Sequence, residues 1–398
     1  MKDAYDAIVI GAGPAGLTVA KVLTARGLEC LVIEQNNEIG QPVSTSGASW
    51  FSDMIKLGIP EAYLNPIFRV TIVAPNEEVT TSFEEPSACI LDVSAVYKFL
   101  ASQAQQNGAE LVLGAKAKDV FLEDGYVKGV RTEIDSRLRI VKSKVVVDAS
   151  GMAAVFVRKL GFLRNWTRRG VGVQYNVECS GIDSHRAVLF LGRKVAPSGY
   201  GWFFPWKSDL ARVGVGMIRP DTNANPDSFA KDLLANVSAL YGQRFKVLGK
   251  ETGVFPCSGA LDAMVTNGFL AVGDAAGQGS PLHGEGIRYA IRFGMIAGLT
   301  IGDAILAKDV SKRRLVKYEN EWRKLEGRNA RVGLAIQKRI SKHTDSQWDR
   351  NVKYLKELEA KNKEMLVQLF KSDFSYKNMW RVFKHSPSKA LKMLLRSG

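Results

Sequence analysis

Residues 7–16 read AIVIGAGPAG, four apolar residues followed by a glycine-rich turn. The apolar run predicts a buried strand, and the amphipathic stretch after the glycines predicts a helix that ends near residue 26. A second strand is expected at 30–34. The order strand, turn, helix, strand around a GxGxxG spacing is typical of a Rossmann-like fold. We therefore predict an α/β protein whose first domain binds a dinucleotide.

The residues of this motif have separate tasks in such a fold. Gly11 permits a tight turn, Gly13 lets the backbone approach a pyrophosphate, and Gly16 lets the helix pack against the strand. Free N–H groups at the helix N-terminus favour the phosphates. Glu34 is placed to hold the ribose 2′-hydroxyl and disfavours a 2′-phosphate, so NADP is a poor fit. The predicted contacts to the ADP half of the cofactor are Gly11, Gly13, Pro14, Ala15, Gly16, Glu34 and Gln35.

A second motif lies far along the chain, where residues 273–277 read GDAAG and residues 281–287 read PLHGEGI. The pattern predicts a strand that ends in Asp274 and a helix that begins at Gly284. In flavoproteins of this arrangement the aspartate meets the ribityl hydroxyls, and the helix dipole stabilises negative charge on the reduced flavin. We therefore predict FAD as the cofactor. The expected contacts are Gly273, Asp274, Gly277, Pro281, Gly284, Glu285, Gly286 and Ile287.

The region from about 165 to 262 consists of short alternating segments, which predict an antiparallel sheet. In one of them Tyr200, Trp202 and Phe204 fall on the same face by the two-residue period of a strand. Three aromatic rings in a row form a wall suited to a long apolar substrate, and they could stabilise positive charge on an alkene carbon. The plain alternative is a well-packed core face.

With these motifs in place, the chain resembles the flavoproteins of the p-hydroxybenzoate hydroxylase fold, and among them the geranylgeranyl reductase family. The resemblance rests on IGQPV at 39–43, on PSGYGWFFP at 197–205 followed by GVG at 214–216, and on residues 273–286. It implies FAD contacts from Pro42 and Val43. It also implies a Rossmann-like FAD-binding domain, an inserted antiparallel substrate domain and a helical C-terminal region, α+β overall. The expected divisions are 1–165 with 263–308, 166–262 with part of 45–92, and 309–398.

The resemblance also implies an activity: an FAD-dependent oxidoreductase that saturates isolated double bonds of a prenyl lipid with a hydride from flavin N5 and a proton. Many family members carry Cys-Gly after Pro-Val, whereas residues 44–47 here read STSG. The proton would then come from Thr45, a water or another group. His283 and Tyr200 are further catalytic candidates, with a turn residue and a wall residue as their plain alternatives. Because the GxGxxG motif occurs once, we expect an external electron donor, a ferredoxin-like protein or NAD(P)H.

Other classes share these motifs. A flavin monooxygenase or halogenase has the same fold and both FAD motifs. A hydroxylase usually carries a DG-type motif where residues 148–151 read DASG, and a halogenase would read more like WxWxIP than YxWxFP. A basic nucleic-acid adaptor on a flavin fold would leave the aromatic wall without use, so we expect no nucleic-acid partner.

The charge of the chain is concentrated in its last part. Residues 308–398 hold 24 Lys/Arg and 10 Asp/Glu, whereas the first 307 hold 31 and 30. Residues 386–396 predict a basic amphipathic helix suited to a membrane surface, with a helix packed on the body as the plain alternative. The first strand begins within about five residues, which leaves no room for a signal peptide, and no window of about 18 apolar residues is uninterrupted. We expect a cytoplasmic protein with peripheral attachment to the inner face of the cell membrane. The scattered cysteines and histidines predict no metal site.

Overall fold

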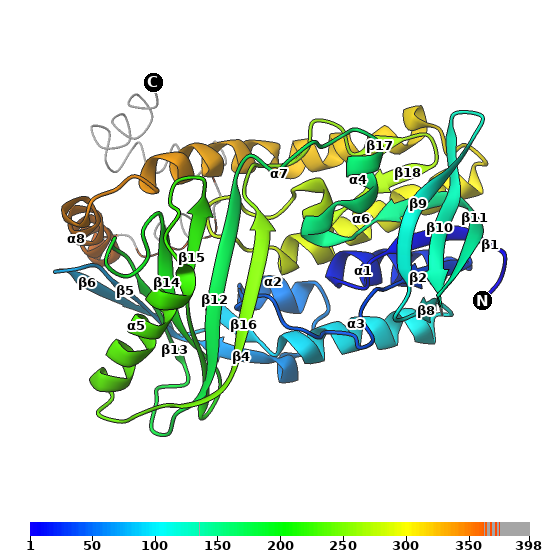
Figure 1. The fold of residues 1–398 in the computed structure, drawn as a ribbon. Coiled ribbons are helices and arrows are strands. Elements are labelled where there is room, and N and C mark those ends of the chain that lie inside the picture. The colour runs from blue at the N-terminus through cyan, green and yellow to red at the C-terminus, as the bar shows by residue number, and fades with distance from the viewer. Residues whose placement is uncertain (135, 362, 364–366, 368–370, 372–373, 375–398) are drawn as a thin grey trace.

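The computed structural model describes residues 1–134, 136–361, 363, 367, 371 and 374. Two large sheets, joined by a small one, carry the helices on their faces (Figure 1). The first sheet runs in the order β17-β18-β11-β1-β2-β8, and β18-β11-β1-β2-β8 form its parallel centre. The short strand β17 pairs with β18 in antiparallel orientation, and β9 and β10 form an antiparallel extension of β11. Its strands are β1 (Ala4–Ile10), β2 (Cys30–Ile33), β8 (Glu110–Val112), β9 (Lys116–Glu123), β10 (Tyr126–Ile134), β11 (Arg137–Asp148), β17 (Val265–Thr266) and β18 (Phe269–Ala271).

Helix α1 packs on β1 and β2 and helix α6 packs on β11, and the strands of the parallel centre are buried and almost uniformly apolar. In β1 the residues Ala7, Ile8 and Val9 are fully buried. Helix α6 packs along α1, and α3 packs on the other side of α1. The flanking elements are α1 (Pro14–Thr24), α3 (Val93–Gln106), η2 (Gly151–Ala153), α4 (Val155–Lys159), η3 (Gly273–Ala276) and α6 (Ile287–Leu306). The predicted α/β class with a Rossmann-like domain is confirmed.

Helix α6 differs from its prediction at one end. It begins at Ile287 rather than at Gly284, because Gly284 has a φ of 70°, a left-handed conformation that a right-handed helix excludes. By length and composition α6 could cross a membrane, and 61% of its most apolar window is buried inside the protein. Its position between α1 and α7 accounts for this composition.

The second sheet is antiparallel through most of its width and runs in the order β16-β12-β15-β14-β13-β5-β6. The alternation of β14 divides its side chains between two faces. Phe203 packs under α5 (Pro226–Leu240), whereas Trp202 and Phe204 lie on the opposite face. The strands are β5 (Arg69–Val73), β6 (Glu78–Ser82), β12 (Arg169–Glu178), β13 (Arg186–Phe190), β14 (Gly199–Lys207), β15 (Leu210–Arg219) and β16 (Lys246–Pro256).

The domain divisions of the sequence analysis stay a prediction. The first sheet takes its strands from residues 4–148 and 265–271, and the second takes its strands from 69–82 and 169–256. A small sheet, β3-β7-β4, takes its strands from residues 48–91, between β2 and β8 of the first sheet. Its elements are β3 (Ala48–Ser49), α2 (Phe51–Lys56), η1 (Glu61–Tyr63), β4 (Leu64–Ile67) and β7 (Ala88–Leu91).

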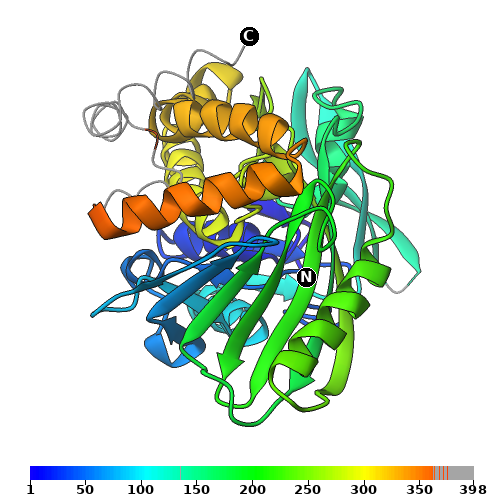
Figure 2. The ribbon, with the colours of Figure 1, turned by 90° about the vertical axis from the view of Figure 1, so that its left-hand side faces the viewer.

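Two helices complete the described chain. α7 (Lys312–Ile340) packs on α6, and α8 (Asp345–Lys361) crosses the sheet edge at β6. Figure 2 shows α8, in orange, above the strands β5 and β6. Val352 and Leu355 of α8 pack on Ile72 and Val79 of that edge. The basic amphipathic helix predicted at 386–396 lies outside the described residues.

Candidate active site

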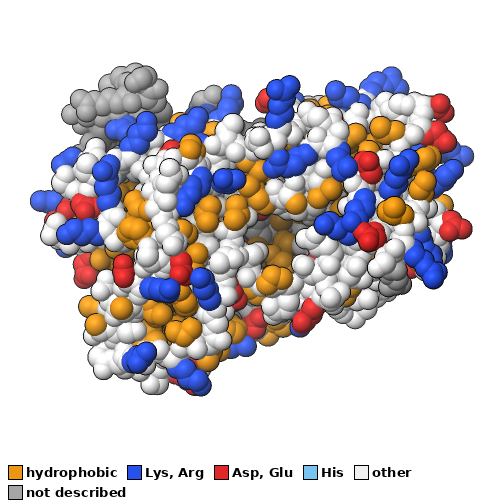
Figure 3. Space-filling model, viewed as in Figure 1, with side chains coloured by type: hydrophobic (Ala, Val, Ile, Leu, Met, Phe, Trp, Pro, Cys, Tyr) orange, Lys and Arg blue, Asp and Glu red, His pale blue; other side chains and the backbone are white. Residues whose placement is uncertain are grey.

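A cavity of about 2230 Å³ runs from the glycine turn after β1 to the exposed face of the second sheet and on to α7 and α8. Pockets for a single ligand usually measure about 300–1,000 Å³. The cavity is therefore large enough for a dinucleotide and a second, sizeable ligand. In the space-filling view the surface is hollowed at its centre, with apolar side chains inside (Figure 3).

The turn after β1 fits the ADP half of FAD. A Cβ on Gly11 would clash with the carbonyl of Ala149, and one on Gly16 would clash with the carbonyl of Gly11, so both positions require glycine. Helix α1 starts at Pro14 without a side-chain cap. Its first N–H groups therefore remain available to a phosphate.

Glu34 directly follows β2 and faces the same turn. Its Oε2 accepts a hydrogen bond of 2.8 Å from the N–H of Ala12, and its Oε1 accepts one of 2.8 Å from the N–H of Asn36. The carboxylate thus holds the turn in shape as well as lining the cavity. A ribose hydroxyl could still approach, because each carboxylate oxygen accepts more than one hydrogen bond.

Asp274 marks the second half of the cofactor site. Its side chain lines the cavity, and among the described residues none donates a hydrogen bond to its carboxylate. Burial raises the pKa of Asp274 to about 6. A carboxylate without donors in a cavity wall suits a ligand that brings hydroxyl groups, as the ribityl chain of FAD does. The carboxylate of Asp274 therefore fits the ribityl side of FAD.

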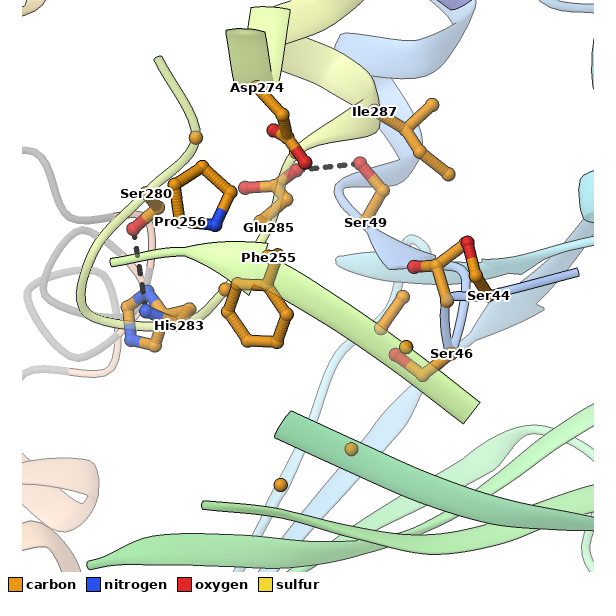
Figure 4. Close-up of a pocket in the computed structure, with 18 of the residues that line it drawn as sticks. Ser44, Ser46, Ser49, Phe255, Pro256, Asp274, Ser280, His283, Glu285 and Ile287 are labelled. Atoms are coloured by element: carbon orange, nitrogen blue, oxygen red, sulfur yellow. Dashed lines mark hydrogen bonds between the residues drawn. The ribbon is translucent and has the colours of Figure 1, made fainter. Parts of the chain in front are cut away.

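The turn 280–286 is shaped by an aromatic ring that sequence reasoning missed. The ring of Phe255 lies between two glycines: a Cβ on Gly284 would be 2.6 Å from this ring, and one on Gly170 would clash with it. Figure 4 shows Phe255 between the His283 turn and the loop at Ser44 and Ser46. Only the tertiary structure brings Gly170, from β12, opposite Gly284.

Glu285 is held by a buried charge network. Its Oε1 accepts a hydrogen bond of 2.8 Å from Ser49 Oγ (Figure 4), and both of its oxygens accept 2.9 Å hydrogen bonds from Arg288. Arg288 Nη1 also contacts Asp53 at 3.2 Å. The side chains of Glu285 and Arg288 are 10% and 12% exposed. Ser49, Asp53 and Arg288 were not predicted as site residues.

The three catalytic candidates, Thr45, Tyr200 and His283, all line the cavity. They differ in whether each can donate a proton to a ligand. Burial lowers the pKa of His283 to about 4, so its ring is neutral at pH 7. The Tyr200 hydroxyl donates a hydrogen bond of 2.6 Å to the carbonyl of His283, and burial raises its pKa. Thr45 Oγ1 accepts a hydrogen bond of 3.4 Å from the N–H of Gly47. Of these three, Tyr200 is already committed as a donor.

The loop that contains Thr45 is fixed by the second sheet. Gln174 Nε2 donates to the carbonyl of Thr45 at 3.1 Å, and Gln174 Oε1 accepts from the indole N–H of Trp202 at 3.2 Å. Buried Arg212 donates to the carbonyl of Ser46 at 2.9 Å. The loop and the aromatic strand are therefore coupled through Gln174, which the sequence analysis did not identify.

The aromatic residues of β14 form the wall that their spacing predicts. The rings of Tyr200 and Trp202 lie 5.9 Å apart, and Trp202 stacks on Phe204 at 6.1 Å. The neighbouring strand makes room for the indole: a Cβ on Gly214 would be 2.7 Å from Trp202 Cζ2, and one on Gly216 would be 3.4 Å from Cζ3. The aromatic motif and the GxG motif thus form one packing unit.

Most of the predicted cofactor residues line the cavity, and four do not. Gly16 packs α1 against β1, and Val43 is buried in the core of the first sheet. Gly273 is buried, and a Cβ on Gly277 would be 2.5 Å from the carbonyl of Gly259. The structure shows these four residues in packing positions, and their contacts to FAD stay a prediction. The predicted residues that line the cavity are Gly11, Gly13, Pro14, Ala15, Glu34, Gln35, Pro42, Asp274, Pro281, Gly284, Glu285, Gly286 and Ile287.

No metal site is found within the described part of the chain, where no three His, Cys, Asp or Glu side chains converge. The four cysteines are buried and unpaired with one another.

The sequence of this chain is similar to those of known flavoproteins. A family model of the geranylgeranyl reductase catalytic domain matches residues 170–253, and one of FAD dependent oxidoreductases matches residues 6–162. A digeranylgeranylglycerophospholipid reductase of Methanosarcina acetivorans is 30% identical over 98% of this chain and 99% of its own length. A second such reductase, from Methanothermobacter thermautotrophicus, is 30% identical over 96% of this chain and 99% of its own.

Solved structures show the same fold. A geranylgeranyl bacteriochlorophyll reductase-like protein from Thermoplasma acidophilum superimposes with a TM-score of 0.87 at 23% identity, and the match covers both chains fully. A flavin-dependent brominase superimposes with a TM-score of 0.71 at 17% identity over 93% of this chain and 94% of its own.

Proposed function

We propose a function from the following premise: this chain belongs to the geranylgeranyl reductase family of FAD-dependent oxidoreductases. The proposal is that it saturates isolated C=C bonds in the geranylgeranyl-type chains of a prenyl lipid. One observation carries this proposal. The aromatic wall of β14, seated on the glycines of β15, faces the same cavity as the glycine turn and Asp274. A long apolar chain could therefore lie between the wall and the flavin.

The cofactor supplies the difficult step: bound FAD, once reduced, provides a hydride from N5. The residues of the chain bind and orient. The turn at Gly11 and the carboxylate of Asp274 would hold the two halves of the cofactor, and the rings of Trp202 and Phe204 would lay the prenyl chain along the sheet. An alkene is a poor hydride acceptor, so the wall would also stabilise positive charge as it develops.

The proton must reach the second alkene carbon. His283 is neutral at pH 7, and the Tyr200 proton is committed to a backbone carbonyl. Ser49 donates to Glu285. Thr45 Oγ1 accepts a hydrogen bond, but its own proton is donated to no described residue. We therefore favour Thr45 as the group that passes a proton from water to the substrate, in the loop where many family members carry a cysteine.

A flavin monooxygenase or halogenase is the alternative function, because such enzymes share this fold: the brominase superimposes on this chain. One feature disfavours a hydroxylase: Asp148, the acid of the DASG segment, is fully buried. It accepts hydrogen bonds from the N–H groups of Ser150, Phe156 and Val157. Its carboxylate therefore serves its own segment and does not face a ligand.

Anaerobic single-turnover experiments test the reductase. The FAD-loaded protein is reduced with dithionite, separated from excess dithionite and mixed with prenyl lipids without oxygen. We expect flavin reoxidation and a mass gain of about 2 Da for each bond saturated, because one hydride and one proton are added. Reoxidation only after oxygen is admitted would support a monooxygenase or halogenase instead.

The electron donor and the location are part of the proposal. A ferredoxin-like protein or NAD(P)H would dock transiently to reduce the flavin. The protein would act in the cytoplasm at the inner face of the membrane, which the basic charge of residues 308–398 supports. Flotation with anionic liposomes tests this: a chain truncated after Ser372 should retain FAD and lose liposome binding, and unchanged binding would refute the tail as the membrane element.

A further inference from the structure

The cavity continues beyond the aromatic wall to the turn between α7 and α8, and there its lining becomes basic. Lys338 and Arg339, in the last turn of α7, and Arg350 and Lys353, on α8, line this end. All four residues are exposed. Figure 3 shows Lys and Arg side chains along the edge that α7 and α8 form. We call these four residues the basic end of the cavity.

Acidic groups of the described chain do not neutralise the basic end. None of its four side chains forms an ion pair with a described acidic residue. Two nearby acids are already engaged: Asp345 accepts from the N–H of Arg193 at 2.6 Å, and Asp349 accepts from Asn76. Among the described residues of α7 and α8 that line the cavity, Glu357 is the acidic one. The excess of positive charge attracts anions.

The turn between α7 and α8 brings these charges to one end of the cavity, because Lys338 and Arg339 lie at the end of α7 while Arg350 and Lys353 lie in α8. Burial, together with the positive charges of Arg339 and Arg350, lowers the pKa of His343 in this turn. The turn is fixed to the second sheet, because Arg193 donates to the carbonyls of His343 and Lys342 at 3.0 Å each. The ring of His343 packs against Trp348 at 5.2 Å. Like charges held close on a fixed turn gain from an anion placed between them.

We infer that the basic end binds the phosphate group of the prenyl lipid whose chain lies along the aromatic wall. The inference rests on the proposed function. One arginine side chain can donate two parallel hydrogen bonds to two oxygens of a phosphate, and the lysines add positive charge. Apolar residues of α7 and α8 that line the same cavity, among them Ile336, Ile340 and Leu355, would hold the chain. A lipid phosphate and a soluble prenyl diphosphate share this chemistry.

Calorimetric titration of the oxidised holoenzyme tests the site, because oxidised flavin cannot turn the substrate over. The ligands are digeranylgeranylglyceryl phosphate in micelles, geranylgeranyl diphosphate, and geranylgeraniol, which has no phosphate. The test variant is Arg339→Gln with Arg350→Gln. The control is Arg313→Gln with Lys356→Gln, which removes two exposed charges from the same helices outside the cavity lining.

We expect the Kd for at least one phosphate ligand to rise about tenfold or more in the test variant, because two charge-assisted hydrogen bonds are lost. The Kd for geranylgeraniol, and all Kd values of the control, should change less than about twofold. If the Kd rises only for the micellar lipid, the site binds a lipid headgroup. If the Kd of geranylgeranyl diphosphate also rises, the site binds the phosphates of soluble prenyl compounds as well. Equal weakening of geranylgeraniol, or unchanged phosphate affinity, overturns the site.

The outcome is separable from the proposed function. If the reduced wild-type enzyme saturates no prenyl chain but the phosphate-dependent binding is lost in the test variant, the reductase proposal fails and the site stands. If prenyl chains are reduced with the same half-saturating concentration in both variants, the reductase stands and the site is refuted. Flavin content and melting temperature confirm that both variants are folded.

Discussion

The hydroxyl of Tyr200 donates a hydrogen bond of 2.6 Å to the backbone carbonyl of His283. This bond joins the aromatic strand β14 to the turn that leads into α6, so the aromatic wall and this turn are held as one unit. The same strand is tied to the Thr45 loop through Gln174. The aromatic motif therefore positions two loops of the site in addition to lining the cavity.

Tyr200→Phe should loosen the flavin-facing turn. The variant removes the hydrogen bond that Tyr200 donates to the partly buried His283 carbonyl, and the loss of such a bond costs about 1–3 kcal/mol. We expect weaker FAD retention, measured by the Kd of FAD for the apoprotein, with the fold preserved. Tyr126→Phe, in β10 and outside the cavity lining, is the control. Equal FAD affinity in the two variants would contradict the role of this bond.

Gly214→Ala should displace the indole of Trp202, since the new Cβ would be 2.7 Å from Cζ2 and 2.5 Å from the Cβ of Gln174. Overpacking of this kind costs about 1–3 kcal/mol. We expect a lower melting temperature and a large loss of prenyl reduction with FAD still bound. Gly249→Ala is a matched control on β16, where nothing lies within 4 Å of the added Cβ. The prediction fails if both variants behave alike.

Glu285→Gln should destabilise the protein, because the largely buried guanidinium of Arg288 would lose the negative charge of Glu285 that pairs with it. Breaking one side of a buried pair costs about 3–5 kcal/mol. Glu285→Gln combined with Arg288→Met removes both charges and should recover part of this loss. Urea unfolding of the two variants measures the difference. A double variant that is less stable than the single one would show that the pair is not what stabilises this turn.

Thr45→Val should slow the reduction of the alkene by about 10²-fold or more if this hydroxyl passes the proton. Thr45→Ser keeps the hydroxyl and should retain most of the rate. Anaerobic single-turnover rates in H₂O and D₂O separate this role from a packing defect, because impaired proton transfer should enlarge the solvent isotope effect whereas a packing defect should leave it unchanged. Valine and serine variants with equal rates would exclude Thr45 as the proton relay.

The stability of the apoprotein should fall as pH rises through about 6, because burial raises the pKa of Asp274 from 3.8 to about 6. A raised carboxyl pKa means that the folded protein binds the proton more tightly than the unfolded chain does. The contribution is therefore complete below pH 3.8 and is lost above the folded-state pKa, up to about 3 kcal/mol. Unfolding of wild type and Asp274→Asn between pH 4 and 7.5 checks this. Parallel curves would show that Asp274 does not titrate in this range.

The local motifs of this chain could be interpreted without a structure because their physics is local. The turn at Gly11–Gly16 requires glycine for reasons contained within one strand, one turn and one helix, and the shared face of Tyr200, Trp202 and Phe204 follows from the strand period alone. The acid at Glu34 follows from its place at the end of β2. These features determined the fold class, the cofactor and the family.

Tertiary structure alone decided the rest, because the remaining partners are far apart in the chain. Phe255 meets Gly170 and Gly284, Ser49 meets Glu285, and Gln174 joins Thr45 to Trp202, each across more than 20 positions of sequence. No periodicity encodes such pairs, since their contacts depend on how two sheets and several loops are packed. The start of α6 was misplaced for the same reason. Gly284 is left-handed and lies against the ring of Phe255, and the sequence determined only that a glycine stands there.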